Sequence, residues 1–146
     1  MTIRCEIVSQ DRLVYEGDVD MVILPGTEGE MGILPNHAPL LSTLNYGILK
    51  VRSKGEEEIF AIAGGVVEVQ PEIVTVLADA AENVEEIDVA RADEARKRAE
   101  EYLKAGPPTD SDSYTAVEAA LRRSNLRLEA ARRYRRSSIR RPYETD

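Results

Sequence analysis

The sequence has little sulfur and few aromatic side chains. Its 146 residues include one Cys (Cys5), one His (His37), six Tyr, one Phe and no Trp. One Cys cannot form an internal disulfide, and one Cys with one His cannot build the usual four-ligand structural zinc site. A disulfide-stapled secreted fold is therefore excluded. With so few aromatic residues, the core has to consist of Val, Ile, Leu and Ala, and the hydrophobic share of 42% is sufficient for one.

Long apolar runs are also missing, and basic residues are scarce in the N-terminal part. No run approaches the roughly 20 apolar residues that span a bilayer, and residues 1–17 lack the apolar stretch of a signal peptide. We therefore expect a soluble protein of a reducing compartment. The net charge is −8, yet residues 1–86 carry 16 acidic and 5 basic side chains and residues 87–146 carry 11 and 14. This reversal predicts two parts with different partners.

Motifs for catalysis are missing as well. There is no GxxxxGK[ST] phosphate loop, no GxSxG, no HExxH and no GxGxxG after a strand pattern. His37 lies in a turn bounded by prolines with no nucleophile near it, so we interpret it as a turn or interface residue. Cys5 lies on a strand pattern and is expected to be a small buried side chain. The chain is predicted not to be an enzyme.

Residues 2–79 have the pattern of an all-β domain. Short runs rich in Val, Ile and Leu are separated by turn residues, and residues 66–70 alternate apolar and polar side chains as a half-buried strand does. Turns are expected at Asn45–Gly47 and at Gly64–Gly65. The pattern predicts a β-sandwich or flattened barrel with mainly hairpin connections. The expected strands are residues 3–9, 13–19, 21–25, 47–51, 57–65, 66–70 and 73–78.

The segment Leu24–Leu41 is rich in Gly and Pro and carries Glu28, Glu30, Asn36 and His37. The residues alone leave two interpretations open. The segment is either a long connection between strands or a rigid, exposed recognition loop.

After residue 86 the apolar spacing changes to that of helices. Asp88 is placed to cap a first helix, which Gly106–Pro108 ends. A second helix is expected from about Tyr114 to Arg136, and the two should pack as an antiparallel hairpin. Two such helices bury little by themselves, so the hairpin needs a platform. The predicted parts are a β-sandwich domain over residues 1–86, a helical hairpin over 87–137 and a frayed tail over 138–146.

The second helix is strongly basic, with nine Arg and a single acid, Glu129, in residues 122–141. The helix dipole favours some basic residues near a C-terminus, but nine exceed that need. Guanidinium groups pair with carboxylates and phosphates, so an acidic protein surface or a nucleotide is the expected partner. The acidic chain and the lack of an aromatic platform argue against nucleic acid. The nine are Arg122, Arg123, Arg127, Arg132, Arg133, Arg135, Arg136, Arg140 and Arg141.

Four motifs follow one another as they do in one protein family: LPGTEGEMGILPNHAPLL (24–41), FAIAGGVVEV (60–69), VTVLADAAE (74–82) and IDVARA (87–92). On these motifs the chain resembles the epsilon subunit of bacterial rotary ATP synthases, which is related to the mitochondrial delta subunit. The resemblance implies a ten-stranded β-sandwich followed by a two-helix hairpin. It also implies a non-catalytic central-stalk subunit, peripheral at the cytoplasmic face of the cell membrane, that couples proton-driven c-ring rotation to ATP synthesis.

By the same resemblance, the hairpin has a folded state on the sandwich and an extended state that inhibits ATP hydrolysis. The implied partners are the gamma subunit, the c-ring and, in the extended state, the catalytic beta and alpha subunits. The implied contacts with the c-ring and gamma are Glu28, Gly29, Glu30 and His37. The implied inhibitory contacts with beta are Arg122, Arg123, Arg127, Arg132 and Arg133.

The resemblance requires no cofactor but implies ATP as a regulatory ligand in some bacterial members. The motif Ile87–Ala92 matches their pattern, although Asp88 as a helix cap and Arg91 as a surface residue explain it equally well. The implied ATP-binding residues are Glu82, Asp88, Arg91, Ala92, Arg98, Arg123 and Arg127. The alternative function is a stand-alone β-sandwich module whose Arg-rich helix binds an acidic protein or nucleic acid.

Overall fold

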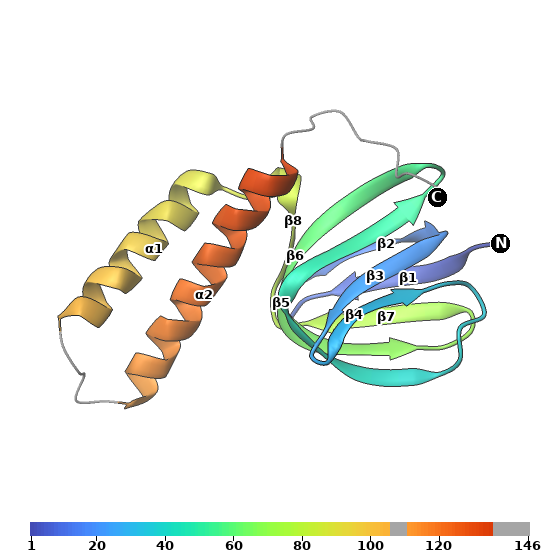
Figure 1. Ribbon diagram of the computed structural model, residues 1–146, viewed down its shortest axis with the longest axis horizontal. Helices are drawn as coiled ribbons and strands as arrows, with labels where there is room; N and C mark the ends of the chain where they lie inside the picture. The colour runs from blue at the N-terminus through green and yellow to red at the C-terminus, as the bar shows by residue number, and fades with distance from the viewer. Residues whose placement is uncertain (106–110, 136–146) are drawn as a thin grey trace.

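The computed structural model describes residues 1–105 and 111–135, in which a strand-rich part and two helices lie side by side (Figure 1). The predicted helix stop at Gly106–Pro108, the tail over 138–146 and three of the arginines (Arg136, Arg140 and Arg141) lie outside these residues. The strands are β1 (Ile3–Val8), β2 (Leu13–Val19), β3 (Met21–Gly26), β4 (Gly29–Ile33), β5 (Leu40–Ser53), β6 (Glu56–Val69), β7 (Ile73–Ala78) and β8 (Ala81–Asn83). A 3-10 turn, η1 (Val84–Glu86), leads to α1 (Val89–Lys104) and α2 (Ser111–Tyr134).

The strands form one sheet in the order β2–β1–β7–β6–β5–β3–β4, with β8 beside β6. The sheet folds over on itself into two layers because the long strands β5 and β6 curve through both (Figure 1). Residues 65–69 of β6 pair with β7, and residues 60–62 of the same strand pair with β8. The pair β1–β7 is parallel, and the connections are otherwise antiparallel as expected. The predicted β-sandwich is confirmed, with eight strands in the described part of the chain rather than about ten.

Two predicted turns are wrong because they lie inside long strands. Gly64 and Gly65 have φ angles of +88° and +139° and bend β6 instead of ending it. A Cβ on Gly65 would lie 2.3 Å from the carbonyl oxygen of Leu77, so the neighbouring strand requires glycine there. Asn45–Gly47 likewise belongs to β5, which continues to Ser53.

The Leu24–Leu41 segment is a paired hairpin in its first half and an irregular connection in its second. Strands β3 and β4 pair as far as Gly26 and Gly29, which leaves residues 27–28 as a tight exposed turn. In the connection, the backbone N–H of Asn36 donates to the carbonyl of Pro71 at 2.9 Å. This bond ties the connection to the turn between β6 and β7.

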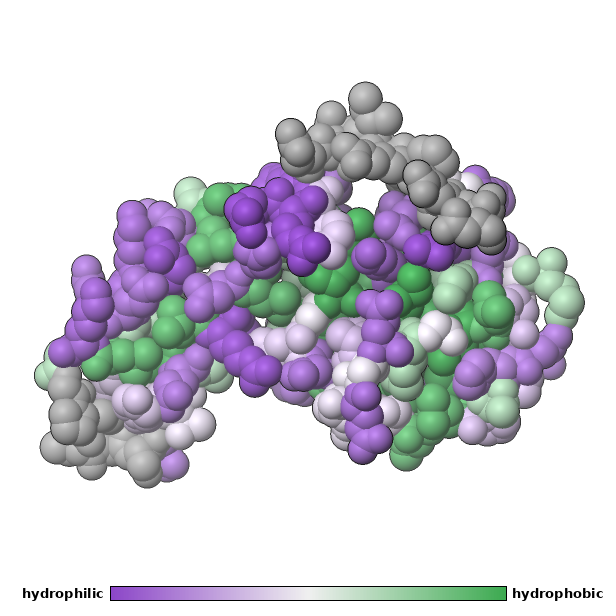
Figure 2. Space-filling view, in the orientation of Figure 1, coloured by the Kyte–Doolittle hydropathy of each residue, from purple (hydrophilic) through white to green (hydrophobic). Residues whose placement is uncertain are grey.

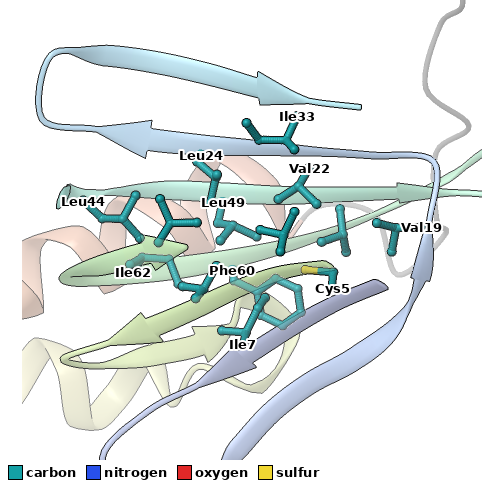
Figure 3. Packing of buried hydrophobic residues seen from close by; sticks show 14 of the residues in the cluster. Cys5, Ile7, Val19, Val22, Leu24, Ile33, Leu44, Leu49, Phe60 and Ile62 are labelled. Atoms are coloured by element: carbon teal, nitrogen blue, oxygen red, sulfur yellow. The ribbon is translucent and has the colours of Figure 1, made fainter. Parts of the chain in front are cut away.

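The space between the two layers is filled by aliphatic side chains that point toward one another (Figure 3). Phe60 of β6 lies among them and meets the ring of Tyr15 edge-on, with centroids 5.6 Å apart. Cys5 is fully buried in this core, as predicted, and burial raises the pKa of its thiol to about 12. A thiol held neutral in this way packs as a small apolar group.

The helices form the predicted antiparallel hairpin (Figure 1). Asp88 caps α1, because its Oδ1 accepts the backbone N–H of Arg91 at 3.1 Å. Ala92 and Ala99 are buried on α1, and Ser124 is buried on α2 with its hydroxyl donated to the carbonyl of Ala120. Helix α2 begins at Ser111, three residues before the predicted start.

Candidate functional site

Helix α2 lies on an outer face of the sandwich and is held there by a small core of its own. In β6, Phe60 and Ile62 face the sandwich core, so Ala61 between them faces the opposite way. Ala61 is 4% exposed and shares a cluster with Ala130 and Ala131 of α2, which are 1% and 7% exposed. These small side chains let helix and sheet approach closely. The other members of this docking core are Val84, Ile87, Ile48, Ile59, Leu126 and Tyr134.

A bidentate ion pair between Glu82 of β8 and Arg127 of α2 lies at the edge of the docking core. The Nε of Arg127 donates to Oε2 of Glu82 at 2.8 Å, and Nη2 donates to Oε1 at 3.1 Å. The two side chains are only 25% and 29% exposed. Charge-assisted pairs with this fork geometry are among the stronger polar contacts in proteins, so the pair helps to hold the hairpin on the sandwich.

Beside this pair, the hairpin and the sandwich border a cleft of about 360 Å³. Glu82, Arg123 and Arg127 line it, together with Ala95 of α1 and small side chains of β6 and the β7–β8 connection. The volume lies in the range of small-molecule sites, and two guanidinium groups suit phosphate oxygens. The structure thus brings together three of the seven predicted ATP-binding residues.

The other four predicted ATP-binding residues are on or next to α1 and do not line this cleft. The carboxylate of Asp88 caps the helix, and Ala92 is fully buried, so its side chain is closed to a ligand. Arg91 and Arg98 are exposed to solvent. The cap interpretation of Asp88 is therefore observed directly, and the donor set at the cleft fits a polyphosphate only in part.

The five arginines predicted to inhibit hydrolysis lie on α2 but do not share one face. At 3.6 residues per turn, Arg122 and Arg133 lie on one side, Arg123 and Arg127 on a second and Arg132 on a third. Arg132 donates to both carboxylate oxygens of Glu129 at 2.8 Å, and this bond lowers the pKa of that carboxyl. Hydrophilic side chains gather over the C-terminal half of this helix (Figure 2). The docked helix therefore exposes basic groups in several directions.

The residues predicted to contact the c-ring and gamma occupy two connections of the sandwich. Glu28, Gly29 and Glu30 are exposed at the turn between β3 and β4, where Gly29 has a φ of +134°. His37 is half-buried in the connection after β4, with its Nδ1 2.7 Å from the carbonyl oxygen of Ala38. The two places lie at opposite ends of β4, so the structure does not unite these four residues in one site.

An exposed apolar row lies on the outer face of the sheet formed by β5, β6 and β7. Val66 and Leu77 are register partners, and Thr43 pairs with Val66 from the other side. Leu41 is two residues from Thr43 and therefore points to the same face. Leu41, Val66 and Leu77 are all exposed. The sequence pattern does not predict this row as a site, although the alternation in residues 66–70 marks Val66 as outward-facing.

Sequence reasoning also missed the residues of β5 that meet the arginine-rich helix. The guanidinium of Arg122 lies 4.0 Å from the ring centroid of Tyr46, and the Nζ of Lys50 lies 5.3 Å from that of Tyr134. Tyr46 lies in a segment with the composition of a turn, so no signal in the sequence marks it as a contact for Arg122, 76 residues further along the chain.

Together these features define a class of protein: a β-sandwich with a helical hairpin docked on one outer face and a cationic cleft between them. Among residues 1–105 and 111–135, no group of three His, Cys, Asp or Glu side chains is placed to hold a metal ion. None of the helices in the described part of the chain has the length and apolar character needed to cross a membrane.

Two family models match nearly the whole chain. The model of the ATP synthase delta/epsilon chain beta-sandwich domain matches residues 2–84, and that of the delta/epsilon chain long alpha-helix domain matches residues 85–132. The chain belongs to the delta/epsilon family of ATP synthase chains, and the predicted family is confirmed.

Individual relatives agree with this assignment. The ATP synthase epsilon chain of Pelotomaculum thermopropionicum is 54% identical over 102 residues, which cover 70% of this chain and 76% of that one. The ATP synthase epsilon chain of Dehalococcoides mccartyi is 44% identical over 140 residues, with 92% and 95% covered. A chain in the cryo-EM structure of the Euglena gracilis mitochondrial ATP synthase, OSCP/F1/c-ring, matches with a TM-score of 0.70 and 29% identity over 89% of this chain and 81% of that one. These matches do not support the alternative of a stand-alone β-sandwich module whose Arg-rich helix binds an acidic protein or nucleic acid.

Proposed function

We propose that the chain is a non-catalytic central-stalk subunit that couples c-ring rotation to ATP synthesis and restrains ATP hydrolysis through its hairpin. The observation that carries this proposal is the separate docking core under α2. Because the docking core and the sandwich core share no residue, the hairpin can leave its platform without unfolding the sandwich. A switch of this kind needs a basic helical hairpin that can separate from a sandwich that stays folded.

The proposed coupling surface is the outer face that carries Leu41, Val66 and Leu77, together with the exposed turn at Glu28–Glu30. An apolar row with a polar border suits a lasting contact with another subunit, here the gamma subunit. The Glu28–Glu30 turn is proposed to face the c-ring, and His37 to face gamma and the ring. This arrangement would hold the chain at the cytoplasmic face of the cell membrane through its partners.

The proposed inhibition uses the arginines of α2 when the hairpin extends along gamma. Guanidinium groups bind carboxylates in bidentate geometry, so they suit an acidic segment of the beta subunits, with alpha beside it. Deleting residues 88–146 and assaying the reconstituted complex tests this role. We expect faster ATP hydrolysis with ATP synthesis retained, whereas unchanged hydrolysis would contradict inhibition by this arm. Turnover of nucleotide by the isolated chain would contradict its non-catalytic role.

ATP is proposed as a regulatory ligand of the docked state. The support is the cleft, which is lined by Arg123 and by Arg127, although two donors of Arg127 are already bound to Glu82. A ligand that binds only the docked state stabilises it by RT ln(1 + [L]/Kd), or about 2.7 kcal/mol at one hundred times Kd. Calorimetry on the full chain should give heat with ATP that is lost in Arg123→Ala and retained in Arg132→Ala, which lies outside the cleft. No heat with the unmodified chain would end the proposal.

A further inference from the structure

Arg122 binds the sandwich at a place that the nucleotide cleft does not include. Its guanidinium lies over the ring of Tyr46, 4.0 Å from the centroid, and its Nη2 donates to Oδ1 of Asn45 at 3.0 Å. The same Oδ1 also accepts the backbone N–H of Tyr46 at 2.9 Å. Asn45 and Tyr46 of β5 therefore form a seat that holds the guanidinium of Arg122 by its face and by its edge.

This seat is independent of the docking core and of the Glu82–Arg127 pair. Tyr46 and Arg122 line a different hollow, of about 500 Å³, on the other side of α2. Neither residue lines the cleft that carries Arg123 and Arg127. The contact consequently favours the docked hairpin whether or not a nucleotide is bound.

We propose that Arg122, Tyr46 and Asn45 form a nucleotide-independent latch for the docked hairpin, and that the latch competes with an acidic partner for the Arg122 guanidinium. This inference rests on the proposed inhibition of hydrolysis by the extended arm. In the docked state Arg122 lies on β5, whereas in the proposed extended state α2 has left the sandwich, so the same arginine cannot make both contacts at once. Release of the latch and exposure of an inhibitory arginine are then a single event.

The latch is expected to contribute only a small part of the free energy of docking, which suits a regulatory contact. Cation–π contacts at exposed sites have the strength to change an equilibrium constant about two- to fivefold. A contact of this size adjusts the ratio of docked to extended hairpins without locking either state.

The competition predicts opposite effects for the two sides of the latch. Tyr46→Leu removes the seat and leaves Arg122 free for the partner, so the variant should inhibit hydrolysis more strongly than the unmodified chain. Arg122→Gln also opens the latch but removes the cation that the partner binds, so inhibition should weaken. If Tyr46 and Arg122 only stabilised the docked hairpin, both substitutions would change the rate of ATP hydrolysis in the same direction.

The first test is amide hydrogen exchange on the isolated full chain. We expect Tyr46→Leu to raise exchange about two- to fivefold at the α2 amides protected by docking, equally with and without ATP. Tyr46→Phe, which keeps the ring, and Tyr102→Leu, on α1, should exchange as the unmodified chain does. Arg122→Gln should have a smaller effect in the Tyr46→Leu background than in the unmodified chain, because the stacking contact is already absent there and only the bond to Asn45 is left to lose. Unchanged exchange in Tyr46→Leu and in Arg122→Gln would overturn the latch.

The second test is ATP hydrolysis by the complex reconstituted with each variant. Slower hydrolysis with Tyr46→Leu and faster hydrolysis with Arg122→Gln support the competition. If removal of residues 88–146 leaves hydrolysis unchanged, the proposed inhibition fails and with it the competition, while the exchange data still decide the latch. If that removal accelerates hydrolysis but Tyr46→Leu behaves as the unmodified chain, the competition alone is overturned.

Discussion

Replacing Ala130 with Leu should detach the hairpin and leave the sandwich intact. Ala130 is 1% exposed and shares the docking core with Ala61 of β6, so there is no room for three further carbon atoms while α2 is docked. On the released helix the same leucine meets only solvent and is a good helix former. The substitution therefore acts on the docked state alone.

The expected magnitude follows from the cost of overpacking a close-packed contact. Added methylenes in a well-packed core cost about 1–3 kcal/mol. At the docking core this cost lowers the ratio of docked to undocked hairpins about 5- to 150-fold. The sandwich has its own core, built around Phe60, Leu24 and Ile62, so its free energy of unfolding should change by less than about 0.5 kcal/mol.

Hydrogen exchange resolved along the chain measures both quantities at once. Amides of α2 that are protected by docking should exchange faster in Ala130→Leu, whereas those of β6 and β7 should keep their protection. Ala116→Leu places the same side chain at an exposed position of the same helix and is the matched control. Unaltered exchange in α2, or an equal loss of protection in the sandwich, would refute the view of two separate cores.

Three further predictions concern the cap, the bend and the buried thiol. Asp88→Ala should destabilise the start of α1 by about 1 kcal/mol, seen as faster exchange of its first amides, while Asp88→Asn retains the cap; equal effects of both would contradict the cap. Gly65→Ala should lower the free energy of unfolding in urea by more than about 1 kcal/mol, because its Cβ would meet the carbonyl of Leu77; Gly55→Ala, with no atom within 4 Å, should cost less. Burial raises the pKa of Cys5 from 9.0 to about 12, so between these pH values the unfolded chain loses a proton that the folded chain keeps. The free energy of unfolding should therefore fall by up to about 1.4 kcal/mol per pH unit above pH 9, and Cys5→Val should remove that part of the slope; an identical slope in the variant would contradict it.

Features that depend on near neighbours in the chain could be predicted from the sequence. The cap at Asp88 needs only the amide of Arg91, three residues away, and the burial of Cys5 follows from the alternation of β1. The hairpin of two amphipathic helices and the sandwich follow from apolar periods of about 3.6 and 2. The order and spacing of the four motifs can be read from the sequence without the fold, and they identified the family.

Features that depend on distant pairing could not be predicted in this way. Asn45–Gly47 and Gly64–Gly65 have the composition of turns, yet they lie inside β5 and β6. In β6, pairing with β8 before the bend and with β7 after it keeps the strand continuous. The ion pair between Glu82 and Arg127 joins residues 45 apart, and the latch joins Asn45 to Arg122 across 77. Among the predicted ATP-binding residues, only the fold selects the three that share a cleft.

The sequence by itself therefore determined the two helices and most of the strands, the division into an acidic β-rich part and a basic helical part, and the family, but not β4, β8 or the continuity of β6. Only the tertiary structure decided that α2 lies against β6 and that the docking core is separate from the sandwich core. It also decided which arginines of α2 line the cleft and which one contacts Asn45 and Tyr46. The physical reason is that helix period and strand alternation fix which face of each element is apolar. Which other element packs on that face depends on the shape and charge of side chains that are distant in the sequence.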